Sequence, residues 1–256
     1  MRTISIANFK GGTGKTVTAC NMAAELAGMG RRVLLIDADP QHNASTFFGG
    51  DYDWSCTLTD VLEGTAEPYW PEDVSCTGLE GLDILPADMG LLRLDLAAIA
   101  GGRSDALRLM GEFLEVIRED DAYDFILFDC PPSFTAASVA ALTNSDDVIL
   151  PTKVDAFSRA GVEELLDQMR DLGRTTRARF RILITMTDRT NLCRQGAAAL
   201  RDSGLRVMET EIRECVKVGE STYARQPLRD YAPKCAAALD YRAAVKEYLQ
   251  EVERDG

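Results

Sequence analysis

The residues best suited to chemistry form a glycine-rich segment near the N-terminus. Residues 10–16 read Lys-Gly-Gly-Thr-Gly-Lys-Thr and follow an apolar, β-branched run at 3–8 that is typical of a buried strand. Glycines let the backbone approach a phosphate closely, and the N–H groups of the helix expected next attract its charge. Lys15 would reach the β- and γ-phosphates, and the Thr16 hydroxyl would hold Mg²⁺. The residues expected to bind the nucleotide are Lys10, Gly11, Gly12, Thr13, Gly14, Lys15, Thr16 and Val17.

The segment departs from the usual phosphate-loop pattern G-x-x-x-x-G-K-[ST], known as Walker A. Phe9 stands at the position of the first glycine, and the pair Gly11–Gly12, preceded by Lys10, compensates for it. This is the deviant Walker A pattern K-G-G-x-G-K-[ST]. Lys10 therefore adds a second cation beside a loop that already carries Lys15.

Aspartates follow two further strand-like runs. Asp37 and Asp39 come after the buried run at 32–36, and Asp129 follows four apolar residues at 125–128. Four apolar residues followed by an aspartate, here Asp129, are typical of the Walker B motif when they come after a phosphate loop in the sequence. The Walker B carboxylate holds Mg²⁺ directly or through water. Asp37 and Asp39 are placed to meet a metal ion or an attacking water, although Asp37 alone also suits a turn or a helix cap.

The elements that must position these residues alternate along the chain. Strand-like runs occur at 3–8, 32–37, 82–85, 124–129, 147–151, 180–185 and 206–210, with helical segments between them. This alternation predicts an α/β fold with a doubly wound, mostly parallel sheet flanked by helices on both faces. The length of 256 residues favours a single domain over residues 1–256. Ligands of such sheets lie at the carboxyl ends of the strands, where the motifs above fall.

Charge and cysteine content narrow the possible partners. The net charge is −13, yet residues 170–234 hold 14 basic and 8 acidic side chains, while residues 1–169 hold 11 and 28. A basic segment on an acidic body is compatible with a polyanion-binding face, although composition alone favours an ordinary solvated helix surface. The seven scattered cysteines form no C-x-x-C pair, which favours reduced cytosolic thiols over disulfides or a zinc site. No signal peptide and no membrane-length apolar run is present, so we expect a cytoplasmic protein.

Taken in order, these motifs resemble those of the ParA/MinD branch of deviant Walker A ATPases, and in particular the small, Soj-like ParA partition proteins. The matching segments are 10–16, 37–44, 129–133, 148–151, 160–166 and 185–192. They keep the family's order, and the resemblance covers nearly the whole length. The resemblance implies ATP and Mg²⁺ as cofactors and a homodimer that forms on ATP binding. It implies that Lys10 is a cation supplied to the partner subunit's ATP and that Lys15 is the phosphate-loop lysine. It also implies that Asp39 positions or activates the hydrolytic water and that Asp129 is a carboxylate near Mg²⁺. The implied metal residues are Thr16, Asp39 and Asp129.

The resemblance also implies two partners. The ATP dimer of such proteins binds non-specific double-stranded DNA, and a ParB-type centromere-binding protein stimulates hydrolysis, so we expect a nucleoid-associated protein. Arg189 and Lys217 stand where the family carries DNA-binding arginines. Glu214, however, stands where a basic residue is usual, which weakens the inference. Nearby arginines could compensate: Arg174, Arg177, Arg179, Arg181, Arg194, Arg201, Arg225 and Arg229.

Three other functions were weighed against this one. A MinD-like membrane ATPase needs a C-terminal amphipathic helix with a basic polar face. The C-terminal segment here has an apolar face that includes Tyr241 and Tyr248, but it ends in acidic residues. We therefore expect this segment to pack onto the body of the protein and not to bind a membrane. A redox or metal-maturation ATPase related to the nitrogenase iron protein needs cysteines that bridge a cluster between subunits. Cys130 follows Asp129, but no second cysteine has a suitable motif around it. A related ATPase that positions another cargo, such as a secretion system, a microcompartment or the division site, stays open.

Overall fold

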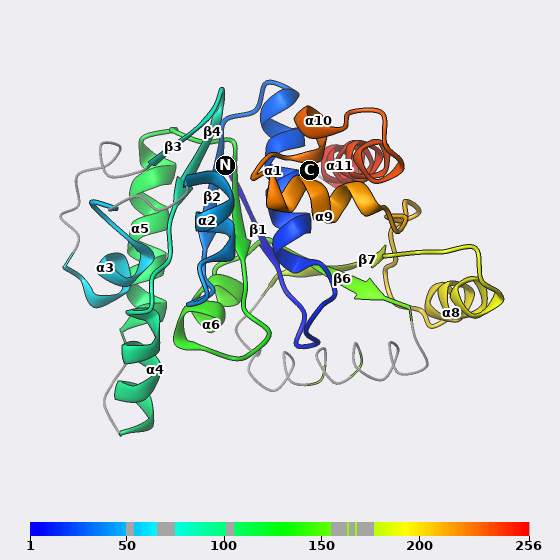
Figure 1. Ribbon diagram of the computed structural model, residues 1–256. Helices are drawn as coiled ribbons and strands as arrows, with labels where there is room; N and C mark the ends of the chain where they lie inside the picture. Colours follow the sequence, from blue (N-terminus) through cyan, green and yellow to red (C-terminus); the bar gives the residue numbers. More distant parts are fainter. Residues whose placement is uncertain are drawn as a thin grey trace.

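A seven-stranded sheet organises the part of the chain that the structure describes. The computed structural model describes residues 1–49, 54–65, 75–100, 105–154, 163, 167 and 177–255. The strand order is β3-β4-β2-β5-β1-β6-β7, and among these neighbours only β3 and β4 run antiparallel (Figure 1). The strands are β1 (Arg2–Ile6), β2 (Val33–Asp37), β3 (Ser75–Leu79), β4 (Leu82–Leu85), β5 (Phe125–Asp129), β6 (Asp147–Lys153) and β7 (Arg179–Thr185).

This topology confirms the expected mostly parallel sheet but corrects two details. The edge strand β3 was not expected from the sequence. The strand expected at 206–210 is wrong, because this segment forms only an isolated bridge between Val207 and Ile182 of β7. The Met208 N–H still donates to the Ile182 carbonyl at 2.9 Å, but those of Glu209 and Thr210 donate to the carboxylate of Glu247 at 2.6 and 2.9 Å, so the pairing with β7 is not continued.

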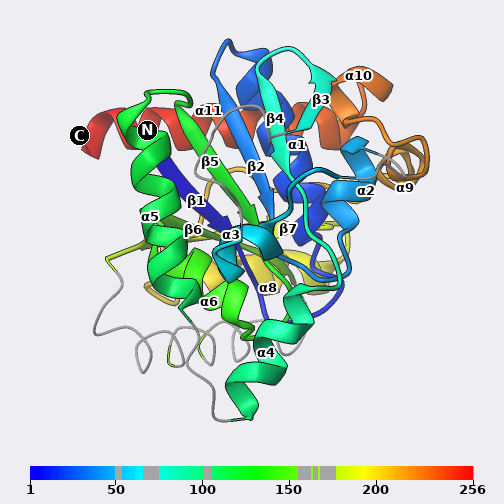
Figure 2. The same cartoon turned by 90° about the vertical axis from the view of Figure 1, so that its left-hand side faces the viewer.

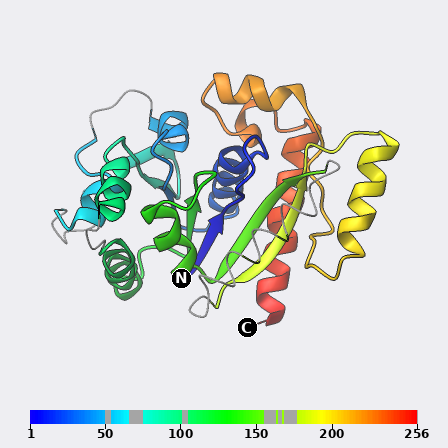
Figure 3. The same cartoon turned by 90° about the horizontal axis from the view of Figure 1, so that it is seen from below.

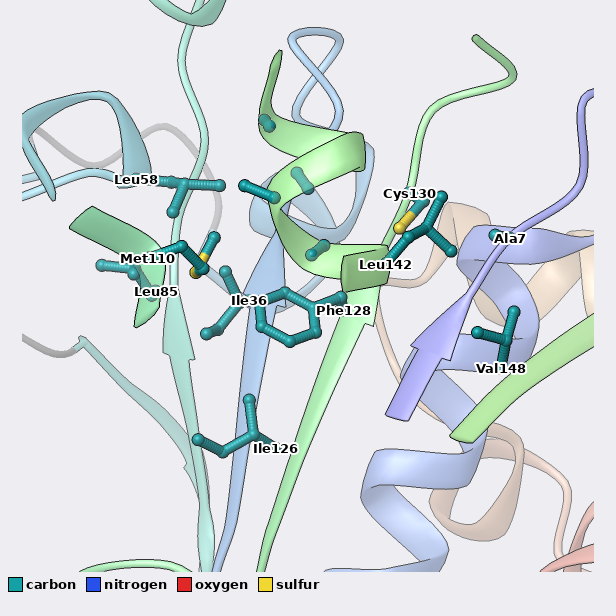
Figure 4. Packing of buried hydrophobic residues seen from close by; sticks show 14 of the residues in the cluster. Ala7, Ile36, Leu58, Leu85, Met110, Ile126, Phe128, Cys130, Leu142 and Val148 are labelled. Atoms are coloured by element: carbon teal, nitrogen blue, oxygen red, sulfur yellow. The ribbon is translucent and has the colours of Figure 1, made fainter. Parts of the chain in front are cut away.

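Consecutive residues of the central strands are buried on opposite faces of the sheet. Leu34, Ile36 and Phe128 belong to one hydrophobic cluster, while Leu35 and Leu127 belong to the other. The first cluster also takes in residues from the helices that cover its face, as Figure 4 shows. A strand buried on both faces needs an unbroken apolar run, and that is why these strands were recognisable in the sequence.

Helices cover both faces of the sheet. The helices are α1 (Lys15–Gly28), α2 (Asn43–Gly49), α3 (Leu58–Glu63), α4 (Leu91–Ile99), α5 (Ala106–Glu119), α6 (Ala136–Thr143), α8 (Asn191–Arg201), α9 (Val216–Tyr223), α10 (Leu228–Tyr231) and α11 (Ala236–Asp255). Helices α3, α5, α6 and α8 contribute to the first hydrophobic cluster, and α1, α2 and α11 contribute to the second. Figure 2 shows α5 and α11 on opposite faces of the sheet.

The C-terminal helix α11 packs on the body of the protein, as the sequence predicts. It runs beside α1 (Figure 3), and its apolar face, including Tyr241, Val245 and Tyr248, is buried in the second cluster. The hydroxyls of Tyr241 and Thr18 lie 3.1 Å apart and join the two helices by a hydrogen bond. Among the described residues, no helix is both long and apolar enough to cross a membrane.

A buried ion cluster joins β1, β6, β7 and α11 at the end of the sheet opposite the glycine loop. Asp147 is fully buried and accepts hydrogen bonds from Arg2, from Arg181 and, at 2.8 Å, from the Tyr248 hydroxyl. Arg181 is itself fully buried and also donates to Glu251 at 2.8 Å. Burial alone would raise the pKa of Asp147, but the hydrogen bonds and charges of the two arginines outweigh it and lower this pKa.

Replacing Asp147 by asparagine should lower the free energy of unfolding by about 3 kcal/mol near pH 7, because it leaves buried arginine charge uncompensated. The pKa of Asp147 in the folded state lies below its value of about 4 in the unfolded state. The ionised carboxylate therefore adds to the free energy of unfolding above about pH 4, and this contribution is lost as the pH falls through the folded-state pKa. Urea unfolding from pH 7 to pH 3 measures both effects. Asp202→Asn at the exposed end of α8 is the control, and an equal loss in the two variants would contradict the role of the cluster.

Candidate active site

The predicted site residues meet at one edge of the sheet. Strand β5 lies between β1 and β2, with Asp129 level with Ile6 on one side and with Asp37 on the other. Because the three strands are parallel, the glycine loop after β1 lies beside the ends of β2 and β5. Figure 1 shows this loop in blue between β1 and α1.

The glycine loop has the backbone conformation that glycine alone adopts easily. Gly12 and Gly14 have φ angles of 73° and 88°, in the left-handed region. Gly14 is the N-cap of α1, so Lys15 and Thr16 open the helix. At Gly11 and Gly12, an added Cβ would meet no described atom within 4 Å. The loop therefore leaves open space beside a helix N-terminus, which suits an anion such as a phosphate.

Hydrogen bonds to two strands far away in the sequence hold the loop in place. The Asn8 amide donates to the Pro151 carbonyl at the end of β6 at 2.8 Å, and it accepts from the Lys10 N–H at 2.9 Å. The Thr185 hydroxyl at the end of β7 donates to the Thr13 carbonyl at 2.9 Å. Sequence reasoning did not single out Asn8 or Thr185 for this role, because their partners lie far away along the chain.

The two lysines of the loop are placed differently. Lys15 is buried, with 8% of its surface exposed, and its ammonium donates to the Lys10 carbonyl at 3.2 Å. Burial lowers the pKa of Lys15, and the nearby Asp129 and Asp39 act in the opposite direction. The Lys10 side chain is exposed, although its main chain is fixed by Asn8 and Lys15. One lysine is thus held inside the glycine loop, while the other lies on the surface.

Asp129 is the least satisfied polar group at this edge. Its carboxylate is fully buried, and neither oxygen has a hydrogen-bond partner among the described residues. Burial, followed by the charge of Asp37, raises the pKa of Asp129 well above its usual value, and the Thr16 hydroxyl opposes this shift. A buried carboxylate with no partner calls for a cation or another ligand in the working state of the protein.

Mg²⁺ fits this environment. The Asp129 carboxylate and the Thr16 hydroxyl are hard oxygen donors, which Mg²⁺ prefers. Within the described ranges, no group of three His, Cys, Asp or Glu side chains forms a metal site by itself. Mg²⁺ at this edge would therefore draw its other ligands from water and from nucleotide phosphates, as is usual for this ion.

The two aspartates after β2 have separate tasks. Asp37 is fully buried and accepts from the Asp39 N–H at 3.1 Å and from the Ser45 N–H and hydroxyl at 2.8 and 2.7 Å. Burial raises its pKa to about 6 despite these hydrogen bonds. Asp37 therefore fixes the loop that carries Asp39, which agrees with the turn role weighed for it. Asp39 is 8% exposed, and one of its oxygens accepts from the Gln41 N–H at 2.9 Å.

The loop after β5 shows no redox chemistry at its cysteine. Cys130 is buried, and burial raises the pKa of its thiol to about 12, so it stays protonated and inert. Six cysteines of the described residues form no disulfide: Cys20, Cys56, Cys130, Cys193, Cys215 and Cys235.

The two residues predicted to contact DNA lie on neighbouring segments, Arg189 between β7 and α8 and Lys217 in the first turn of α9. A backbone bridge between Thr187 and Arg213 places the segments of Arg189 and Lys217 side by side, and both side chains are exposed. The Lys217 ammonium pairs with Glu220 at 2.6 Å, and this contact raises the pKa of Lys217. Glu214, also exposed, lies on the same segment.

Several arginines expected to compensate for Glu214 do not form a basic surface. Arg181 is fully buried in the ion cluster, Arg179 lies 3.6 Å from Asp147, and Arg201 pairs with Glu211 at 2.7 Å. The described part of this segment, residues 177–234, is thus less basic on its surface than its composition suggests. Arg174 and most of the matching segment 160–166 lie outside the described residues.

Comparison with known proteins identifies the family. A family model described as an AAA domain matches residues 1–182. The chain is 39% identical over 263 residues to the chromosome partitioning protein ParA of Caulobacter vibrioides, covering 100% of this chain and 96% of that protein. The chain belongs to the ParA/MinD family of ATPases.

Solved ParA/MinD-like structures agree with this assignment. Cobyrinic acid a,c-diamide synthase from Mycobacterium smegmatis, with bound ADP and magnesium, has a TM-score of 0.83 at 27% identity and covers 100% of this chain and 97% of its own. The septum site-determining protein MinD from Pyrococcus horikoshii, complexed with Mg-ADP, has a TM-score of 0.75 at 27% identity, with coverages of 96% and 95%. These likenesses confirm the predicted fold class. Their nucleotide and magnesium agree with the ATP and Mg²⁺ expected from the sequence.

Proposed function

We propose that this protein is a Mg²⁺-dependent DNA-segregation ATPase of the ParA type, which dimerises on binding ATP. The ATP dimer binds double-stranded DNA without sequence specificity, and a ParB-type centromere-binding partner stimulates hydrolysis and releases the dimer. The protein accordingly works in the cytoplasm on the nucleoid. The observation that carries the proposal is the contrast between a buried Lys15 and an exposed Lys10 on the same glycine loop.

The two lysines divide the work on the transferring phosphoryl group. Lys15, buried beside Asp129 and Asp39, neutralises the β- and γ-phosphates of the ATP bound to its own protomer. Lys10 is exposed and its main chain is fixed, so its side chain can extend from the surface towards the nucleotide of a second protomer. A cation supplied in this way stabilises the charge of the transition state, as an arginine finger does. The active site is therefore complete only in the dimer.

The carboxylates hold the other participants. Mg²⁺, when bound, neutralises charge on the phosphates and in doing so supplies the cation that the Asp129 carboxylate lacks. Thr16, Asp39 and Asp129 would hold it. Asp39, on the loop fixed by Asp37, orients and activates the water that attacks the γ-phosphate.

DNA binding is tested with the Asp39→Ala variant, which should retain ATP and stay dimeric. With ATP and Mg²⁺ it should bind arbitrary duplex DNA, and its affinity should fall steeply as salt rises, because Lys and Arg side chains displace counterions. Arg189→Ala and Lys217→Ala should each weaken binding and reduce the salt slope by about one. Arg108→Ala, on the exposed face of α5, is the matched control. A stable ATP dimer that ignores DNA at low salt would contradict the partition function.

A second function in the same family is favoured by the charges near the predicted DNA contacts. Glu220 neutralises Lys217, and Glu214 adds a negative charge to the same segment. MinD, a septum site-determining protein, also shares the fold. An ATP dimer without DNA affinity would therefore point to an ATPase that positions another cargo, such as a secretion system, a microcompartment or the division site.

A further inference from the structure

Two aromatic side chains connect the loop of Lys10 with the loop of Asp129. Phe9 immediately precedes Lys10, and Phe134 lies between Asp129 and helix α6. Their ring centroids are 3.9 Å apart, and the rings are inclined at 49°. The two rings are in direct contact, and contacts between aromatic rings stabilise a structure beyond the burial of their surface. The contact therefore ties the two loops together across the site.

Phe9 completes the anchoring of the Lys10 main chain. On one side, Asn8 bonds the Lys10 N–H and the end of β6. On the other side, the Phe9 ring packs against the first hydrophobic cluster and against Phe134. The backbone around Lys10 is thus held from β6 and from the loop after β5, while its side chain is exposed.

Phe134 lies where the Asp129 loop enters rigid structure. The next residue, Thr135, caps α6 by accepting from the Ser138 N–H at 3.1 Å. The Ala136 N–H then donates to Asp95 of α4 at 2.7 Å. The Phe134 side chain is 38% exposed, which is a poor position for a residue that serves only the core. Its ring instead fills the gap between the two loops.

We propose that Phe9 and Phe134 are positioning residues, which hold Lys10 in the place it needs to reach the partner's nucleotide. This inference rests on the proposed ATP-dependent dimer. When ligands at Asp129 fix the loop after β5, the aromatic pair passes that restraint to the backbone of Lys10. Neither ring lies on the glycine turn at 11–14 or on Lys15, and the Asn8 and Lys15 hydrogen bonds to the Lys10 main chain remain without the pair, so the pair affects dimerisation more than binding of nucleotide to the protomer's own loop.

The test compares Phe9→Ala, Phe134→Ala and the double variant in the Asp39→Ala background. Analytical ultracentrifugation with ATP and Mg²⁺ gives the dimer dissociation constant, and a fluorescent ADP analogue gives the affinity of the monomer for nucleotide. Each single variant should raise the dimer dissociation constant about tenfold, because a loss of about threefold per aromatic pair occurs twice in a symmetric dimer. The affinity for the ADP analogue should change less than twofold. The double variant should be no worse than either single variant, since all three lack the same contact.

Three further variants keep the test specific. Phe134→Tyr retains the ring at a half-exposed position and should restore dimerisation, while Phe134→Leu retains apolar volume and should not. Leu239→Ala, which removes a side chain of similar exposure from α11, should leave the dimer unchanged. Additive single effects, rescue by leucine, or a parallel loss of ADP affinity would overturn the positioning role. If the Asp39→Ala parent itself fails to dimerise with ATP, the proposed function fails; if the parent and Phe134→Ala dimerise equally well, only the positioning role fails.

Discussion

Replacing Lys10 by alanine should lower ATP turnover about 10³-fold and leave the affinity for ADP nearly unchanged. A cation supplied to the transition state by a partner contributes factors of roughly 10³ to 10⁵ in related phosphoryl-transfer enzymes. The effect on binding is small because the Lys10 side chain is exposed, while main-chain atoms make the contacts that shape the loop. Steady-state hydrolysis at saturating ATP and titration with a fluorescent ADP analogue measure the two quantities.

Two controls separate this effect from general damage to the loop. Lys15→Ala should lose both nucleotide affinity and turnover, because Lys15 is buried inside its own loop. Lys246→Ala, on an exposed position of α11, should change neither. A Lys10→Ala variant that keeps turnover within threefold of the wild type would remove the basis for a shared active site.

Asp129→Asn should make the nucleotide-free protein more stable while abolishing hydrolysis. The wild-type carboxylate is fully buried, lacks a hydrogen-bond partner among the described residues, and has a raised pKa. A neutral amide avoids the cost of burying that charge, so urea unfolding at pH 7.5 without Mg²⁺ should show a gain of about 1–2 kcal/mol. Turnover should fall at least about 10²-fold, because the amide cannot replace the carboxylate beside Mg²⁺.

Asp37→Ala gives the opposite sign and serves as the comparison. The Asp37 carboxylate accepts from Asp39 and twice from Ser45, so its removal leaves buried donors unpaired and should cost about 2 kcal/mol. If Asp129→Asn destabilises the protein as much as Asp37→Ala does, the Asp129 carboxylate is not held in readiness for a cation.

Local patterns in the sequence were enough to predict the centre of the site. The left-handed glycines at 12 and 14, the helix that opens at Lys15, and the strand before Asp129 depend on neighbouring residues. The order of parallel strands then brings their ends together. For the same reason, the fold class could be predicted from buried, unbroken strands.

The contacts that hold the site could not be predicted, because they join residues far apart in the chain. Asn8 bonds Pro151, and Thr185 bonds Thr13. The buried position of Arg181 follows from the pairing of β6 with β7, which places Arg179 opposite Asp147. Arg181, two residues further on, lies on the same face of β7 as Arg179, and both contact Asp147. A count of charges over residues 170–234 cannot reveal that Arg181 is buried in an internal ion cluster.

Mixing two inactive variants tests the claim of a shared active site most directly. Lys10→Ala keeps its own nucleotide site but supplies no lysine to a partner, while Asp39→Ala supplies Lys10 but cannot activate its own water. In an equimolar mixture that exchanges protomers at random, half of the dimers contain one of each, and each of these has one complete site. Hydrolysis should therefore recover to about a quarter of the wild-type rate. A mixture no more active than either variant alone would contradict the account, because Lys10 would then act on its own protomer.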